Sequence, residues 1–288
     1  MNPSITTSTE PLPESEIAEE IETATEEQAT LAGEENRISA IVITFNEADN
    51  IQECLATLHW VHEIVVVDAE SKDATAALAQ EFTDKVFTRK WEGYSTAKDF
   101  AMSQCTGNWV LWIDADERIT PELRQEICEE LSSPTQCNGY EIPRLANFLG
   151  RWIMHGGWYP GHVLRLFRRD QGFFNGLSVH EGVRLKGKVG RLRNHMLHYT
   201  DRNIDQYYTK LNRYTSLAAE ELHRLGKPFL WRDLLFRPAW LFLRMYIFKT
   251  GFLDGMQGFI LACFSAVYVL VKYAKLWEIE TRGRDQSL

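Results

Sequence analysis

The sequence predicts an α/β fold with a mostly parallel sheet, and three observations support this. Short apolar, β-branched runs alternate with amphipathic helical segments between residues 37 and 135. Clustered polar residues directly follow several of these runs. From about Ile204 onward the pattern becomes helical throughout. Strand–helix alternation is typical of parallel sheets covered by helices on both faces, and ligands bind at the carboxyl edge of such sheets.

The first 36 residues differ in composition from the rest of the chain. They contain ten glutamates and no Lys or Arg, and they are rich in Thr, Ser and Pro. Such a segment buries too little apolar surface to offset its ordering entropy, so residues 1–36 are predicted to be a disordered acidic tail. The segment has neither the basic start nor the apolar run of a signal peptide. The remaining 252 residues are nearly neutral, with 31 basic and 30 acidic side chains.

The elements of the first half follow from hydrophobic periodicity. Strands are predicted over Ile38–Thr44, Glu63–Asp68, Val86–Thr88 and residues 109–113. Between them we expect a helix capped by Asn46, with Ile51, Leu55 and Leu58 on its buried face, and helices over residues 74–82 and 95–103. Thr120 and Pro121 then start a helix whose apolar face comprises Leu123, Ile127 and Leu131.

The second half begins with shorter strands among Gly- and Trp-rich loops. Strands are predicted over residues 139–145, 163–168 and 189–199, followed by helices from Ile204. The five cysteines have no metal-ligand spacing and are odd in number, which favours reduced thiols in a cytosolic setting. The globular part has no Lys/Arg run with interleaved aromatic residues, so no nucleic-acid partner is expected.

The most informative motif is Asp114-Ala115-Asp116-Glu117, directly after the apolar run 109–113. Two carboxylates separated by one residue can hold a hard divalent cation, which in turn neutralises a diphosphate. Similar polar clusters follow the first two strands, at residues 44–47 and 68–73. Neither the dinucleotide fingerprint Gly-x-Gly-x-x-Gly nor a P-loop is present. The recurrence of polar strand ends therefore predicts a ligand site at this edge.

Several motifs occur in a recognisable order: residues 41–47 (Ile-Val-Ile-Thr-Phe-Asn-Glu), 66–75 (Val-Val-Asp-Ala-Glu-Ser-Lys-Asp-Ala-Thr), 91–94 (Trp-Glu-Gly-Tyr) with Lys98, and 114–117. Together they resemble family 2 glycosyltransferases of the GT-A fold. Residues 155–160, 165–168 and 179–181 resemble the branch that includes lipopolysaccharide inner-core β-glucosyltransferases. The resemblance covers roughly residues 37–280. Glu70 departs from it, because many relatives carry Gly or a small polar residue in that loop.

The resemblance implies a role for each motif on the donor side. Thr44 and Glu47 are expected to line a uracil–ribose pocket, with Asp68 hydrogen-bonded to the uracil. Asp73 is expected to cap the following helix or to contact the ribose, which Asp114 also faces. Asp116 is expected to bind Mg²⁺ or Mn²⁺ between the donor phosphates, with His198 as a further metal ligand. The implied donor-binding set also includes Asn46, Ser71 and Lys98, the last near the phosphates.

On the acceptor side, inverting transfer requires a base that takes the proton of the attacking hydroxyl. Glu181 matches the family position of that base, and His180 is expected to orient it or to contact the acceptor. Trp158 and Tyr159, in a Gly-rich loop with Trp152, suit stacking on a sugar face or packing in a small subdomain. Arg165, with Arg168 nearby, is expected to hold an anionic acceptor group.

The C-terminal helices combine basic and bulky apolar residues. Between His223 and Lys275 the chain has eight Lys/Arg and two Asp. This composition predicts helices that lie on an anionic membrane surface. The apolar run 258–271 is shorter than the roughly 20 residues of a spanning helix, so a single span is the second choice and soluble core helices the third.

The sequence thus predicts a donor half (residues 37–135), an acceptor half (136–203) and a membrane-associating region (204–288). The predicted function is transfer of a hexose, glucose by preference, from a UDP-sugar to a membrane-associated glycan or glycolipid at the cytoplasmic face of a membrane. A nucleotidyltransferase is disfavoured because residues 44–50 lack a Gly-rich basic loop. A non-catalytic sugar-nucleotide-binding or membrane interaction protein is the other alternative, but it would be expected to have lost Asp116 or Glu181.

Overall fold

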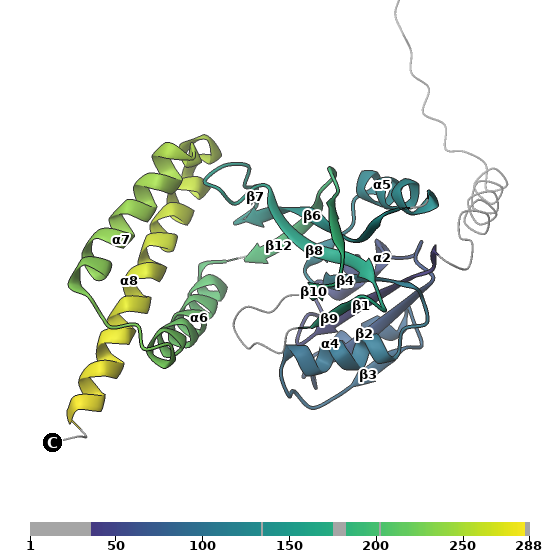
Figure 1. The fold of residues 1–288 in the computed structure, drawn as a ribbon, viewed down its shortest axis with the longest axis horizontal. Coiled ribbons are helices and arrows are strands. Elements are labelled where there is room, and N and C mark those ends of the chain that lie inside the picture. The colour runs from purple at the N-terminus through teal and green to yellow at the C-terminus, as the bar shows by residue number, and fades with distance from the viewer. Residues whose placement is uncertain (1–35, 134, 175–182, 202, 286–288) are drawn as a thin grey trace, which may run out of the picture.

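The computed structural model describes residues 36–133, 135–174, 183–201 and 203–285. Over these residues the protein has one large sheet with helices on both faces, and a group of long helices extends from one end of it (Figure 1). The predicted acidic tail falls, except for Asn36, outside the described residues.

The strands have the following bounds: β1 Ile38–Thr44, β2 Glu63–Asp68, β3 Val86–Thr88, β4 Trp109–Asp114, β5 Glu117–Arg118, β6 Cys137–Phe148, β7 Arg151–Trp152, β8 Gly161–Arg168, β9 Gly172–Phe174, β10 Val183–Leu185, β11 Lys188–Arg191 and β12 Met196–Asp201. The helices are α2 Ile51–Ala56, α3 Thr75–Gln80, α4 Tyr94–Ser103, α5 Pro121–Ser132, α6 Ile204–Arg224, α7 Trp231–Leu243 and α8 Gly255–Asp285. Two short helical turns, η2 Arg244–Phe248 and η3 Gly251–Asp254, connect α7 to α8.

The large sheet has a parallel half and a mixed half. Its order is β3-β2-β1-β4-β8-β6-β12-β5, and the first four of these strands are parallel. β8 pairs antiparallel with both β4 and β6, whereas β12 runs parallel to β6. The carboxyl ends of β1, β4 and β12 consequently meet in one region, as the polar strand ends predict.

Side chains of the parallel strands point alternately to the two faces of the sheet, and both faces are buried. Val42, Val66 and Leu111 point to the face covered by α2, α3 and α5. The residues predicted to be buried by helices pack on this face: Ile51, Leu55, Leu58, Leu123, Ile127 and Leu131. Ile41, Val65 and Val110 point to the opposite face, which α4 covers. The prediction of helices on both faces is confirmed, and it follows from the period-2 alternation of strands buried on two sides.

Two predictions of local structure are wrong. Asn46 does not cap the first helix: it adopts a left-handed conformation with φ of 54°, and α2 begins only at Ile51 after Asn50. The loop between β1 and α2 is therefore longer than predicted. Asn tolerates the left-handed conformation better than most residues do. The predicted strand over residues 189–199 is two strands, β11 and β12, interrupted at residues 192–195.

The C-terminal helices are fixed to the sheet domain through one buried carboxylate. Asp254 is 2 % exposed and accepts hydrogen bonds from the backbone N–H groups of Met154 and His155, at 3.3 and 2.8 Å, and contacts His155 Nδ1 at 2.9 Å. Apolar packing reinforces this junction, because Phe148 and Ile153 pack with Met245 and Leu261. The loop after β7 is therefore held by the connection between α7 and α8.

α6 is fixed to α8 by both polar and aromatic contacts. Lys275 Nζ of α8 donates to Asn212 Oδ1 at 2.7 Å and to the hydroxyls of Thr215 and Ser216. The rings of Tyr207 and Tyr208 lie 4.9 and 5.2 Å from that of Phe264. α6 lies between the sheet and the α7–α8 pair (Figure 1).

Candidate functional site

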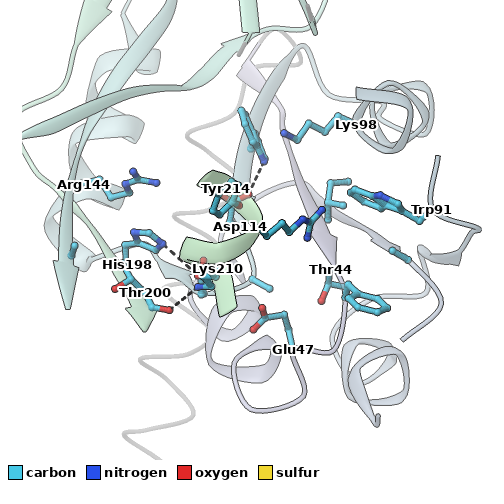
Figure 2. Close-up of a pocket in the computed structure, with 18 of the residues that line it drawn as sticks. Thr44, Glu47, Trp91, Lys98, Asp114, Arg144, His198, Thr200, Lys210 and Tyr214 are labelled. Atoms are coloured by element: carbon cyan, nitrogen blue, oxygen red, sulfur yellow. Dashed lines mark hydrogen bonds and ion pairs between the residues drawn. The ribbon is translucent and has the colours of Figure 1, made fainter. Parts of the chain in front are cut away.

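A cavity of about 990 Å³ lies at the carboxyl edge of the sheet. Its lining residues come from the strands β1, β4, β6 and β12, from the loops after β1, β2, β4 and β7, and from α4, the loop before it, and α6. They are Ile43, Thr44, Phe45, Glu47, Ala69, Trp91, Lys98, Trp112, Asp114, Ala115, Asp116, Arg144, Ala146, Trp158, His198, Thr200, Lys210, Arg213 and Tyr214. Figure 2 shows Arg144, His198, Thr200 and Lys210 on one side of this cavity and Thr44, Trp91 and Lys98 on the other.

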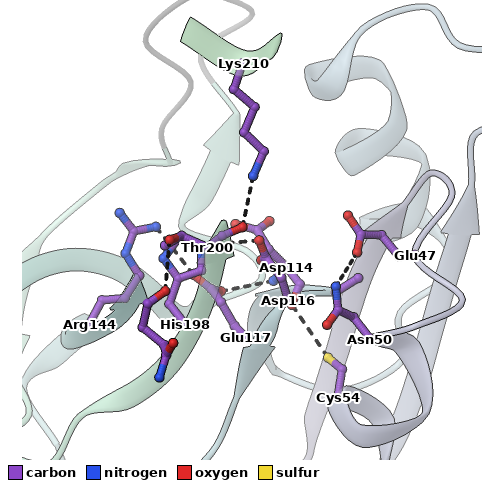
Figure 3. Close-up of polar contacts among 12 residues, drawn as sticks. Glu47, Asn50, Cys54, Asp114, Asp116, Glu117, Arg144, His198, Thr200 and Lys210 are labelled. Atoms are coloured by element: carbon purple, nitrogen blue, oxygen red, sulfur yellow. Dashed lines mark hydrogen bonds and ion pairs between the residues drawn. The ribbon is translucent and has the colours of Figure 1, made fainter. Parts of the chain in front are cut away.

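The turn from Asp114 to Glu117 carries the carboxylates of the site. Glu117 is completely buried and its Oε2 accepts a hydrogen bond from the Asp114 N–H at 3.0 Å, which closes the turn. Arg118 donates to the carbonyls of Ala115 and Glu117, both at 2.9 Å, and holds the turn from below. The backbone of the turn is thus fixed, and Asp114 and Asp116 line the cavity. Figure 3 shows these two residues beside Glu117 and His198.

A buried arginine compensates two of these carboxylates. Arg165 is 3 % exposed, and its Nη2 lies 2.5 Å from Asp114 Oδ2 and 2.8 Å from Glu117 Oε1. Its guanidinium also lies 3.9 Å from the centre of the Trp112 ring. Arg165 is therefore the buried counter-charge of the turn. It does not face an open acceptor surface, where the sequence analysis expects it to hold an anionic group.

The two carboxylates paired with Arg165 shift in opposite directions. Burial would raise the pKa of Asp114, but the charge and hydrogen bond of Arg165 and the charge of Lys98 lower it below its usual value. Burial raises the pKa of Glu117 despite the opposing charge of Arg165. Opposite charge favours the ionised form and burial the neutral form, so the cavity-facing Asp114 is the firmly ionised member of the pair.

Asp116 and His198 form the pair that suits a metal ion. Their side chains are 19 % and 16 % exposed, and His198 Nε2 lies 3.3 Å from Asp116 Oδ2. The Tyr199 N–H donates to the Asp116 carbonyl at 2.8 Å, which aligns β12 with the turn. The Asp116 carboxylate is the oxygen ligand that Mn²⁺ and Mg²⁺ prefer, and the His198 imidazole suits a transition-metal ion better than Mg²⁺. No cluster of three or more His, Cys, Asp or Glu side chains suited to a metal occurs within the described ranges.

Lys98 and Thr44 contribute buried polar groups to the cavity. Lys98 is only 2 % exposed, and its Nζ lies 3.6 Å from the centre of the Trp112 ring, a cation–π contact. The Thr44 hydroxyl is buried and lacks a hydrogen-bond partner within the described structure. A buried polar atom without a partner is rare in folded proteins and is consistent with a ligand that supplies one.

Four of the predicted donor residues stabilise loops and do not line the cavity. Asp68 accepts the N–H of Ser71 at 2.9 Å, and Ser71 Oγ accepts the N–H of Asn46 at 2.8 Å. Asn46 Oδ1 accepts the Lys72 N–H at 2.7 Å, and Asp73 Oδ1 accepts the Thr75 N–H at 3.0 Å. The loops after β1 and β2 are thereby joined, so these side chains shape the wall on which Thr44, Glu47 and Ala69 lie.

The predicted acceptor residues have different surroundings. Trp158 lines the cavity and packs against Phe148, whereas Tyr159 is outside the lining and packs edge-on against the ring of His195 at 5.9 Å. The guanidinium of Arg168 lies over the Trp109 ring at 4.9 Å. His180 and the predicted base Glu181 lie outside the described residues.

The sequence interpretation missed five polar lining residues: Arg144 of β6, Thr200 of β12, and Lys210, Arg213 and Tyr214 of α6. Arg144 lies 3.5 Å from Glu117. The only signal for the α6 residues is their spacing, since positions three and four apart share one face of a helix. Nothing in that spacing indicates which surface the face would cover.

The chain is similar in sequence to known glycosyltransferases. The sequence profile of glycosyl transferase family 2 matches residues 39–184. The chain is 34% identical to the lipopolysaccharide core biosynthesis glycosyltransferase LpsC of Rhizobium meliloti over 84% of this chain and 92% of that protein. It is 31% identical to an uncharacterized glycosyltransferase of Rickettsia felis over 86% and 92% of the two chains.

Among solved structures, the mannosyltransferase PcManGT of Pyrobaculum calidifontis, in complex with GDP-Man and Mn²⁺, has a similar fold. The TM-score is 0.51 at 12% identity, over 91% of this chain and 97% of that one. The similarity supports the predicted GT-A architecture.

Proposed function

The chain belongs to glycosyltransferase family 2 and is a glycosyltransferase, and on that premise we propose that it moves glucose from UDP-glucose to a membrane-associated glycan or glycolipid with inversion. The observation that carries the proposal is the paired Asp116 and His198 at 3.3 Å beside the cavity-facing Asp114. The catalytic unit comprises residues 37–203 together with α6, because α6 contributes to the cavity lining.

In this proposal, the donor nucleoside lies against the loops after β1 and β2. The buried Thr44 hydroxyl and the Glu47 carboxylate are the polar groups there, and Phe45 and Trp91 supply aromatic surface. Asp116 and His198 would hold Mn²⁺ or Mg²⁺, which supplies Lewis-acid stabilisation of charge on the departing diphosphate. No third His, Cys, Asp or Glu side chain joins these two among the described residues, so the protein alone should hold the ion weakly. Metal binding should therefore depend on the nucleotide.

The reaction needs a second set of groups on the acceptor side. By family resemblance Glu181 takes the proton of the acceptor hydroxyl as its oxygen attacks the anomeric carbon. The oxygen–carbon bond forms on the face opposite the departing UDP, which gives inversion. Trp158 lines the cavity and offers a flat apolar surface on which the acceptor sugar could stack.

Glu181→Gln should lower the rate of transfer by about 10²–10⁴-fold, since the amide keeps the size of the side chain but cannot accept a proton. UDP affinity should change little. Steady-state kinetics and UDP calorimetry on the same preparation separate the two effects. If donor affinity falls in parallel with the rate, Glu181 belongs to the nucleotide site and another residue is the base.

The proposed acceptor is consistent with the surface of the C-terminal helices. Large apolar side chains of α7, η2, η3 and α8 are exposed: Trp231, Leu235, Phe236, Trp240, Leu243, Ile247, Phe248, Phe252, Leu253 and Met256. Arg232, Arg244 and Lys249 are exposed in the same segment. Apolar surface with interspersed cations suits the headgroup region of an anionic membrane. Within the described residues, one helix, Gly251–Arg282, is long and apolar enough to cross a membrane.

The double variant Arg244→Glu/Lys249→Glu should bind anionic vesicles at least about 30-fold more weakly at low salt, since each surface cation contributes about 1 kcal/mol. Arg232 and Arg237 are left unchanged because both pair with Asp233, at 3.8 and 2.8 Å. Lys188→Glu/Arg193→Glu, on β11 and just after it, makes the same change of charge at exposed positions elsewhere and should bind as the wild type does. Vesicle sedimentation measures both.

Raising ionic strength should weaken the binding of the wild-type protein without abolishing it, because salt screens only the charge contribution. Wild-type protein that ignores anionic vesicles at low salt would contradict membrane association. Resistance to alkaline carbonate extraction from native membranes would instead support a single span.

The donor is tested by thermal shift of purified full-length protein against a panel of nucleotide sugars, with and without Mn²⁺. UDP-glucose with Mn²⁺ should give the largest stabilisation. A larger shift with a GDP- or CMP-sugar would contradict the assignment of the donor.

A further inference from the structure

We propose that Lys210 and Arg213 of α6 form a binding site for a phosphate anion at the cavity, and that the donor diphosphate occupies it. This inference rests on the proposed function. It assigns to α6, which follows the segment matched by the family profile, a direct part in binding the donor.

The first observation is the distribution of charge around the cavity. The lining carboxylates Glu47, Asp114 and Asp116 all come from the loop after β1 and the turn after β4. The lining residues from β6, β12 and α6 include no carboxylate: they are Arg144, Ala146, His198, Thr200, Lys210, Arg213 and Tyr214. The lining carboxylates thus come from the first half of the sheet, where Lys98 is a further cation, whereas Arg144, Lys210 and Arg213 give the other half of the lining a positive charge.

The second observation is the position of Lys210 relative to the candidate metal ligands. Lys210 Nζ donates to the Thr200 carbonyl at 3.1 Å (Figures 2 and 3). Thr200 follows His198 by two residues on β12, and His198 contacts Asp116 at 3.3 Å. The ammonium therefore lies beside the groups that would hold the metal. A diphosphate bound at this end of the cavity would lie within reach of the Lys210 ammonium.

The third observation is that the two cations repel each other along the helix. Lys210 and Arg213 are three residues apart, and like charges at that spacing repel each other by a few tenths of a kcal/mol. A dianionic ligand between the two side chains would remove the repulsion, and Lys275 with Phe264 fixes the helix that presents them.

The test uses full-length Lys210→Gln, Arg213→Gln and the double variant, with UDP and uridine as probes in the presence of Mn²⁺. Each single change should lower UDP affinity about tenfold, in line with charge-assisted hydrogen bonds to phosphate, and should leave uridine affinity unchanged. Lys210→Arg keeps the charge and should bind UDP within about threefold of the wild type. Arg224→Gln removes a cation about 21 Å further along the same helix and should have no effect.

An alternative source of the same anion is a phosphate or carboxylate on the acceptor. If the variants keep UDP affinity but raise the KM for the acceptor, the site is real and its occupant is the acceptor. If UDP affinity and acceptor KM both stay at wild-type values in the double variant, the inference is wrong. Wild-type protein that binds UDP no better than uridine would instead contradict the proposed function itself.

Discussion

Asp116→Ala should lower sugar transfer by at least about 10³-fold, because it removes the carboxylate proposed to hold the metal ion, and such an ion would contribute several kcal/mol to the reaction. The side chain is 19 % exposed and makes its contact with His198 at the cavity surface, so its removal should leave the fold intact. Transfer from the radiolabelled donor and UDP calorimetry with and without Mn²⁺ measure the two consequences. The Mn²⁺-dependent part of UDP affinity should disappear.

Two further variants make this test specific. Asp84→Ala removes an exposed carboxylate just before β3, at the opposite edge of the sheet, and should behave as the wild type does. Asp114→Asn should affect metal dependence less than Asp116→Ala does and nucleotide affinity more. Full, Mn²⁺-stimulated turnover by Asp116→Ala would falsify the metal assignment.

Arg165→Met should destabilise the protein by about 3–5 kcal/mol, since removing one partner of a buried ion pair leaves its counter-charges uncompensated. The guanidinium is the common partner of Asp114 and the fully buried Glu117, at 2.5 and 2.8 Å. For a chain of this size that loss corresponds to a fall in the midpoint of thermal unfolding of about 10 °C. Calorimetry or circular dichroism measures it.

A second change distinguishes charge from packing. Arg165→Met/Glu117→Gln removes the buried carboxylate as well and should recover part of the lost stability, because the remaining amide needs no counter-charge. Arg191→Met breaks the exposed pair with Glu141 at 2.7 Å and should cost less than about 1 kcal/mol. Equal losses for Arg165→Met and Arg191→Met would mean that the buried network contributes nothing special.

The parallel half of the sheet could be predicted because its signals are local. Each strand is a short apolar run, each helix has its own apolar face, and Thr120 caps α5 by accepting the Leu123 N–H at 3.2 Å, as predicted. The edge that holds the cavity follows from polar residues that end successive parallel strands. Asp116 and His198 were both predicted, and the structure brings them together across 82 residues of sequence.

The remaining features depend on contacts between distant segments. Arg165 faces the carboxylate turn because β8 pairs antiparallel with β4, with Leu166 opposite Leu111. No local pattern specifies that register, so Arg165 was interpreted as an acceptor contact. α6 covers the cavity because Lys275 and Phe264 of α8 hold it there. The spacing of Lys210 and Arg213 shows that they share one face of α6, but it does not show which surface that face covers.

We propose that this cavity transfers glucose from UDP-glucose to a membrane-associated glycan or glycolipid. The most direct test of this proposal is to incubate the full-length protein with UDP-[¹⁴C]glucose and membranes of the source cell, and to count label in the extracted glycolipid fraction. We predict Mn²⁺- or Mg²⁺-dependent labelling that EDTA stops and that Asp116→Ala does not support. Labelling that continues undiminished in EDTA, or a folded protein that transfers no label from UDP-glucose, would contradict it.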